Sequence, residues 1–175
     1  IIARNLGPEG KGMLTAAFIL PEIFASFGHF GLPISNIYFI GKGRDKQTLL
    51  VNSLLFILFA SAIYLIAAFI LFPFYQRIYY GGINPLIAIS SLLLIFLLIS
   101  KHFLSHFQRG LEKYTQYSIA SLIQPIVRLI LIILVVIYYK LSIEFTIIAS
   151  LLSILASDIY NIINISKDVP IKYRK

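Results

Sequence analysis

Cysteine and tryptophan are absent from this 175-residue chain, and methionine occurs once. Without cysteine the chain forms no disulfide and has no thiolate to use as a nucleophile or metal ligand. Charged residues are also scarce, at 13% of the chain against about 25% in ordinary globular proteins. A soluble domain of this length could not bury so many hydrophobic residues, which make up 59% of the chain. A soluble fold is therefore excluded.

Long apolar runs fill most of the chain, and short basic or Gly/Pro-containing segments separate them. Crossing a hydrocarbon core about 30 Å thick takes roughly 20 residues of α-helix. The runs are continuous, which excludes the alternating strands of a membrane β-barrel. We predict one all-α domain over residues 1–175, a polytopic transmembrane helical bundle. Its five complete spans are Met13–Ile40, Leu49–Phe72, Pro85–Leu104, Ser118–Tyr139 and Ile143–Ile165.

Basic residues are distributed unequally between the two sets of connections, and Lys and Arg in short loops collect on the cytoplasmic side. The set with ten of them comprises Gly41–Thr48, Lys101–Tyr117 and Ser166–Lys175; the set with four comprises Ile1–Gly12, Pro73–Asn84 and the turn around Lys140. The richer set is predicted to be cytoplasmic. The net charge of +8 then reflects topology and contact with membrane lipids. Nucleic acid is not predicted as a partner, because no basic stretch is interleaved with exposed aromatics.

The chain opens with Ile1, Ile2 and Ala3, without an initiator methionine or the basic n-region of a signal peptide. The predicted orientation places this end outside the membrane. We therefore interpret Ile1–Ala3 as the outer end of a preceding helix, so that the chain is expected to be a six-helix unit cut inside its first helix. A cleaved signal peptide is the alternative interpretation.

The first span contains two prolines and two glycines. Proline removes a backbone donor and clashes with the preceding turn, so we expect kinks or a break at Pro21 and Pro33. Gly28 and Gly31 would allow a neighbouring helix to approach closely. Interrupted backbone at membrane depth persists only where protein or a water-filled cavity covers it. The pattern is compatible with a cavity wall or with simple helix packing. A further kink is expected at Pro125 in the fourth span.

Three charged residues, Glu22, Arg128 and Asp158, lie inside predicted spans and away from the span ends. A charge at the bilayer centre costs about 2.5–3.5 kcal/mol even on the mild insertion scale. Such residues usually face the bundle interior or a hydrated route. Gln124 precedes Arg128 by one turn and Asn161 follows Asp158 by one turn. The predicted cavity residues are therefore Arg128, Glu22, Asp158, Gln124 and Asn161.

Arg128 is the leading candidate, because it lies near mid-membrane and cannot become neutral by losing a proton. The alternative is an internal ion pair with Glu22 or Asp158 that only fixes helix packing. For Asp158, a helix end that emerges into the headgroups is an alternative to a cavity face.

No enzyme site is readable, because no nucleophile, base and acid occur together. His102 and His106 have the i, i+4 spacing of metal ligands, but a third ligand is not evident and they are interpreted as interfacial. Gly41–Gly43 is too short for a phosphate-binding loop. The sequence therefore predicts neither a cofactor nor a metal.

One local motif carries a family resemblance. Ala3–Gly12 reads ARNLGPEGKG, and the following span contains Pro21 and ends in Phe27–Leu32, which reads FGHFGL. This segment resembles polysaccharide (O-antigen, Wzx-type) flippases, of the superfamily that includes MATE multidrug exporters and the lipid II flippase. Gly41–Thr48 and Gln108–Tyr114 also look like cytoplasmic connections of that family.

The resemblance implies two six-helix lobes around a central cavity, of which this chain would supply helices 2–6 of the first. It also implies a transporter, not an enzyme, in the cytoplasmic membrane. Its partner would be an undecaprenyl-diphosphate-linked oligosaccharide, moved outward, with the second lobe supplied by the same polypeptide. Arg128 occupies a helix where contact with the diphosphate is plausible. The alternatives are a MATE-like drug exporter and a membrane glycan polymerase or ligase.

Overall fold

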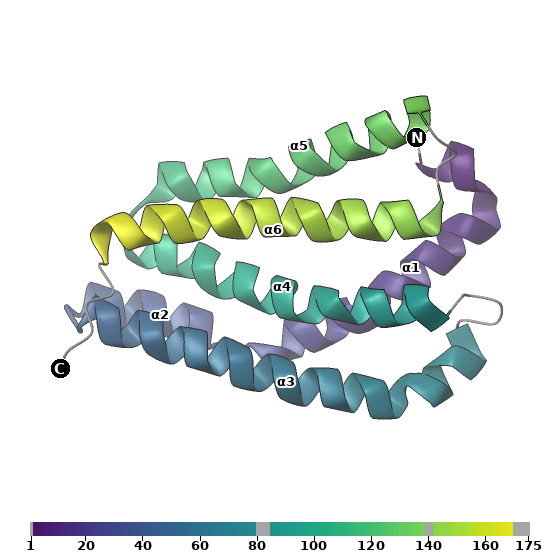
Figure 1. Cartoon of the computed structure of the whole chain (residues 1–175). Helices are drawn as coiled ribbons and strands as arrows, with labels where there is room; N and C mark the ends of the chain where they lie inside the picture. Colours follow the sequence, from purple (N-terminus) through teal and green to yellow (C-terminus); the bar gives the residue numbers. More distant parts are fainter. Residues whose placement is uncertain (1, 80–84, 139–141, 170–175) are drawn as a thin grey trace.

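The computed structural model describes residues 2–79, 85–138 and 142–169. Over these residues the chain is helical and contains no strand, which confirms the all-α prediction. The helices lie roughly along one direction in an elongated bundle (Figure 1). They are α1 (Ile2–Gly28), α2 (Leu32–Gly41), α3 (Lys46–Tyr79), α4 (Pro85–Gly110), α5 (Tyr114–Tyr138) and α6 (Ile143–Asp168).

Within the described residues, four helical segments are long and apolar enough to cross a membrane: Asn5–Gly41, Lys46–Leu71, Tyr114–Tyr138 and Ile143–Asp168. The first of these combines α1 and α2, so it corresponds to the predicted broken span. The remaining predicted span is α4, which runs alongside the others and packs against all five.

The first span breaks at residues 29–31, and α2 begins at Leu32, one residue before Pro33. Phe30 and Gly31 have positive φ angles of 46° and 71°, and the Gly31 N–H donates to His29 Nδ1 at 3.2 Å. Pro33 stands in the first turn of α2, where its missing N–H costs no helical hydrogen bond. The break is confirmed. The helix is not interrupted at Pro21, and α5 likewise continues through Pro125.

Several helices extend beyond the predicted apolar spans. The N-terminal segment is helical from Ile2, with a kink at Gly7 (φ 72°, ψ 178°), although Ile1–Gly12 was expected to be a connection. The third helix continues to Tyr79 and α4 continues to Gly110. The length of an apolar run marks the part of a helix in hydrocarbon, whereas helical hydrogen bonds continue into the interface. The predicted cytoplasmic segment that begins at Lys101 is therefore largely helix.

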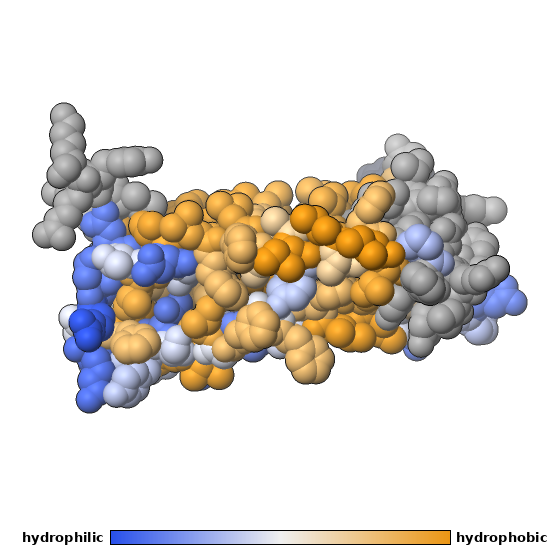
Figure 2. All heavy atoms as spheres, turned by 90° about the horizontal axis from the view of Figure 1, so that it is seen from below, coloured by the Kyte–Doolittle hydropathy of each residue, from blue (hydrophilic) through white to orange (hydrophobic). Residues whose placement is uncertain are grey.

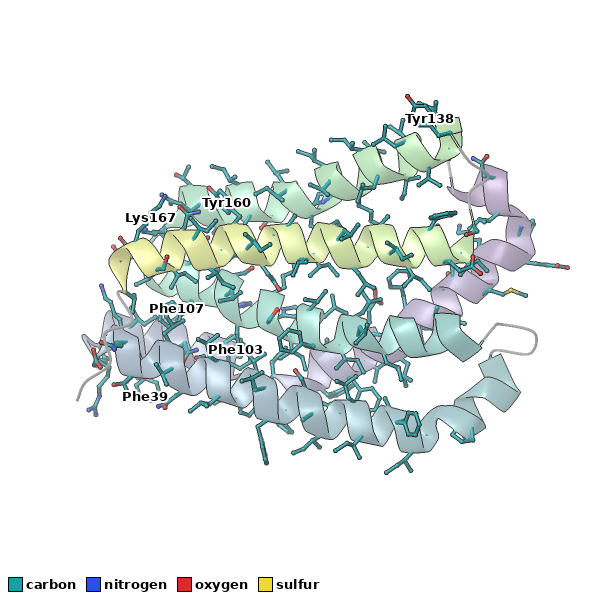
Figure 3. The ribbon with its side chains drawn as sticks, viewed as in Figure 1. Phe39, Phe103, Phe107, Tyr138, Tyr160 and Lys167 are labelled. Carbon is teal, nitrogen blue, oxygen red and sulfur yellow. The ribbon has the colours of Figure 1, made fainter. Side chains whose placement is uncertain are left out.

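The apolar core surrounds α4. Phe103 and Phe107 lie between α4 and the layer formed by α2 and α3 (Figure 3). The Phe103 ring is 5.5 Å from that of Phe56 on α3, centroid to centroid. Close backbone approach adds to this packing. A Cβ atom built on Gly28 would be 2.7 Å from the Tyr64 ring of α3, which confirms the expected close contact at this glycine.

The connections that the charge count grouped together lie at the same end of the bundle. The α2–α3 and α4–α5 connections and the end of α6 meet at the left of Figure 1, where the Lys113 ammonium forms an ion pair with Asp168. Figure 2 shows an apolar belt over the middle of the molecule and hydrophilic side chains gathered at that left end. Tyr138 and Lys167 lie at opposite ends of the bundle in Figure 3. Which end is cytoplasmic stays a prediction.

Candidate functional site

A cavity of about 300 Å³ lies between α1 and α5. On α1, its lining residues recur every three or four positions, so they share one helical face. Across from them, α5 contributes Arg128. The lining residues are Lys11, Leu14, Thr15, Phe18, Ile19, Glu22 and Arg128. The cavity therefore combines two cationic side chains, one carboxylate and an aromatic ring.

Arg128 is half-buried at this cavity, and its guanidinium carbon is 5.3 Å from the centre of the Phe18 ring. This is the geometry of a cation–π contact, worth about 0.5–2 kcal/mol. Among the described residues, the guanidinium forms no ion pair with Glu22 or Asp158. Glu22 still attracts Arg128 electrostatically from the other wall. The Phe18 ring therefore holds the Arg128 guanidinium group in place, and no ion pair with Glu22 or Asp158 engages its N–H donors.

A second polar site is centred on α4, between the middle of the bundle and its left end in Figure 1. Asp158 of α6 is 4% exposed, and its Oδ2 is hydrogen-bonded to the Ser100 hydroxyl of α4. The neighbouring Lys101 ammonium donates to the side-chain oxygen of Gln124 on α5. The Ser157 hydroxyl donates to the carbonyl of Ala120 at 2.8 Å. These contacts join α4, α5 and α6 inside the apolar bundle.

Consecutive residues of α4 point to different helices, because each step along an α-helix turns by about 100°. Ser100 meets α6 and Lys101 meets α5. The ring of His102 lies 5.5 Å from that of His29, which stands in the α1–α2 break, and 6.4 Å from that of His106. No group of three or more His, Cys, Asp or Glu residues in the described part of the chain is arranged to hold a metal ion.

Two buried amides lie between this polar site and the left end of the bundle. Asn161 and Gln108 are fully buried, and within the described residues neither side-chain amide has a hydrogen-bond partner. The same holds for Oδ1 of Asp158. An unsatisfied buried polar group costs about 1–3 kcal/mol, so such groups mark places where water or a ligand is bound.

The model of the polysaccharide biosynthesis protein family matches residues 1–169. The chain belongs to that family. The match runs through all six helices and confirms the resemblance seen in the N-terminal motif. Neither the curated proteins nor the solved structures produced a match to this chain.

In this polysaccharide biosynthesis protein, the five predicted cavity residues separate into two places. Arg128 and Glu22 share the α1–α5 cavity. Asp158 and Gln124 belong to the polar site at α4, with Asn161 one turn further along α6. Pairing of Arg128 with Asp158 is not seen. Asp158 is buried between helices, which favours a place in the bundle interior over a helix end that emerges into the headgroups.

Sequence reasoning missed Lys11, Ser100, Lys101 and His29 as site residues of this family member. Lys11 and Lys101 were assigned to connections because each lies near the end of an apolar run. One signal was available: Ser100, Lys101 and His102 form a polar triplet directly after the apolar run Leu92–Ile99. The spacing of Lys11 and Glu22, eleven residues or about three turns apart, also places both on one face of a helix.

Proposed function

We propose that this membrane protein is part of a flippase that moves lipid-linked oligosaccharide from the cytoplasmic to the external leaflet of the cytoplasmic membrane. Family membership supports a role in polysaccharide biosynthesis. The observation that carries the transport proposal is the α1–α5 cavity with Arg128 at its wall. On this proposal the chain is not an enzyme.

The substrate would be a long isoprenoid lipid joined through a diphosphate to sugars. Its tail can remain in the hydrocarbon, whereas the diphosphate and sugars need a polar route. Arg128 offers a planar fork of donors that matches phosphate oxygens, and Lys11 adds a second positive charge. Such contacts gain strength in a low-dielectric cavity. A second lobe of the same polypeptide would close the route opposite this one.

The competing functions make different use of the same site. A MATE-like drug exporter needs acidic groups for cationic drugs, and Glu22 is the acidic residue of the α1–α5 cavity, beside two cations. A membrane glycan polymerase or ligase would need a catalytic set that its sugar substrate can reach, whereas the hydroxyl–carboxyl pair of Ser100 and Asp158 is buried between α4 and α6. The cavity has two cationic side chains and one carboxylate, and this excess of positive charge favours an anionic substrate.

Deletion of the full-length gene tests the proposal. We expect loss of surface polysaccharide while complete lipid-linked oligosaccharide accumulates on the inner leaflet, inaccessible to a lectin added outside intact cells. Normal surface polysaccharide would contradict the proposal, and so would accumulation of precursor that the external lectin can reach, since a polymerase defect has that effect. If the deletion strain makes no lipid-linked oligosaccharide at all, the protein is an enzyme of precursor synthesis and not a transporter.

A further inference from the structure

The hydroxyl group of Ser100 contacts two oxygen atoms. Its Oγ is 3.0 Å from the carbonyl oxygen of Leu97, one turn back on α4, and it also contacts Oδ2 of Asp158. A backbone carbonyl only accepts hydrogen bonds, and an ionised carboxylate also only accepts. A serine hydroxyl has a single hydrogen, so it cannot donate fully to both.

The number of hydrogens decides between two states of Asp158. If Asp158 is ionised, one of the two oxygen–oxygen contacts of Ser100 has no hydrogen, and two acceptors face each other in an apolar interior. If Asp158 carries a proton on Oδ2, that proton is donated to Ser100 Oγ and the serine hydrogen is donated to Leu97. Both contacts are then complete hydrogen bonds. Donation by a helical serine to a carbonyl of the preceding turn is common.

The surroundings of Asp158 also disfavour a negative charge. Asp158 lines a cavity of about 300 Å³ between α3, α4 and α6, whose other lining residues are apolar apart from Ser100. Leu54, Ile57 and Leu58 form the α3 wall. A charge at this depth is costly unless a counter-ion contacts it. Within the described residues, the carboxyl group forms no ion pair.

Lys101 is the titratable group that faces Asp158. It comes from α4 and acts on the carboxyl group electrostatically, but its ammonium donates to Gln124 of α5. The residues that α5 and α3 contribute nearby are uncharged. Among the described residues, Lys101 is the titratable group that acts electrostatically on Asp158. The cation that could neutralise Asp158 is thus engaged by a neutral amide.

We propose that Asp158 is a proton-binding site inside the membrane, with Lys101 as its movable counter-ion. In the structure described here the carboxyl group holds its proton and Lys101 ties α4 to α5. Loss of the proton breaks the O–H bond, leaves the electron pair on the carboxylate and delivers the proton to water. The new carboxylate then draws the Lys101 ammonium away from Gln124, and the tie between α4 and α5 is replaced by one between α4 and α6.

Asn161 and Gln108 provide a route for the released proton. Asn161 lies three residues beyond Asp158 on α6, and Gln108 lies eight residues beyond Ser100 on α4, both toward the same end of the bundle (Figure 1). Their buried amides have no protein partner among the described residues, so they are able to hydrogen-bond the water molecules that carry a proton. On this proposal Asp158 exchanges its proton with water at the end of the bundle that lies at the left of Figure 1. This inference does not depend on which molecule the protein transports.

Infrared difference spectroscopy of the full-length protein in lipid vesicles tests the proposal. A protonated carboxyl group has a C=O stretching band that a carboxylate lacks. We expect this band at neutral pH in the wild type, its loss in Asp158→Asn, and its retention in Glu22→Gln, which removes a different carboxyl group within the spans. A wild-type spectrum that gains the Asp158 band only near pH ~4, where an exposed aspartate titrates, would overturn the proposal.

Two further variants keep the proposal testable if Asp158→Asn does not fold. In Lys101→Met we expect the band to persist to higher pH than in the wild type, because the counter-ion that favours proton loss is gone. In Ser100→Ala the band should remain but shift in frequency, because the acceptor of the carboxyl proton is lost. If Asp158 and Lys101 are an ordinary ion pair, the band is instead missing in the wild type and appears in Lys101→Met.

Discussion

At the scale of single residues, Arg128 combines three features that seldom occur together in a membrane span. It is half-buried, it stacks on Phe18, and in the described part of the chain it forms no ion pair with Glu22 or Asp158. A contact with an aromatic face uses the plane of the guanidinium and leaves its edge N–H groups for a ligand. The energetic cost of keeping such a cation in the membrane is understandable if an anionic substrate meets it.

Replacement of Arg128 tests this interpretation. We expect Arg128→Ala to abolish export of polysaccharide to the cell surface, and Arg128→Lys to retain part of it, because lysine keeps the charge but loses the bidentate fork. The matched control is Leu129→Ala, on the adjacent, 51% exposed residue of the same helix. Surface polysaccharide is measured in cells at equal levels of membrane protein.

A double replacement distinguishes substrate binding from an internal charge balance between Arg128 and Glu22. If the two residues only compensate each other, removing both charges leaves no uncompensated buried charge, and export should recover. We expect the double variant Glu22→Gln, Arg128→Gln to remain inactive. Normal export by this variant would reject a role for Arg128 in holding substrate.

At the scale of helices, α4 organises the bundle because it packs against every other helix. Its last residue, Gly110, lies against α2. A Cβ atom at Gly110 would be 2.8 Å from Cδ1 of Ile40 and 3.2 Å from the Cα atom of Ile37. The second contact is with backbone, which cannot move aside as a side chain can.

Substitution at Gly110 should therefore loosen the α2–α4 contact. We expect Gly110→Ala to destabilise the protein by about 1–3 kcal/mol, the usual cost of overpacking. Gly41→Ala is the matched control, since a Cβ atom there meets nothing within 4 Å. The measurement is the thermal unfolding midpoint of the full-length protein in detergent. Equal midpoints for the two variants would mean that α2 and α4 are not packed as closely as described.

At the scale of the whole molecule, the charge distribution predicts an orientation in the membrane. The connections rich in Lys and Arg gather at one end of the bundle, which is predicted to be cytoplasmic. This end includes Lys42 and Arg44, both exposed beyond the end of α2. The polar site at α4 lies between this end and the middle of the bundle.

The natural absence of cysteine allows a direct test of the orientation. Single cysteines in place of Lys42 or Arg44 should escape a membrane-impermeant thiol reagent added to intact cells and react once the cells are opened. A cysteine in place of Glu9, exposed near the other end, should react in intact cells. Labelling of the Lys42 or Arg44 variants from outside would invert the orientation.

Much of the architecture follows from hydropathy alone, because a continuous apolar run of membrane length has no stable alternative to a helix. The four segments of membrane length in the described part of the chain, and the break near Pro33, were predictable for that reason. The presence of a proline did not predict a break at Pro21 or Pro125, because the helix continues through both residues. Neighbouring helices support a proline within a span, so proline by itself does not locate a break.

The sequence determined that this protein is a helical membrane protein of the polysaccharide biosynthesis family and that it carries ionisable residues within its spans. Only the tertiary structure decided which of these residues meet. Spacing along one helix determines the face on which Arg128 or Asp158 stands, but it says nothing about the rotation of that helix against its neighbours. Side-chain packing sets the rotation. Packing placed Arg128 beside Phe18, left Asp158 with Ser100, and turned Lys101 toward Gln124.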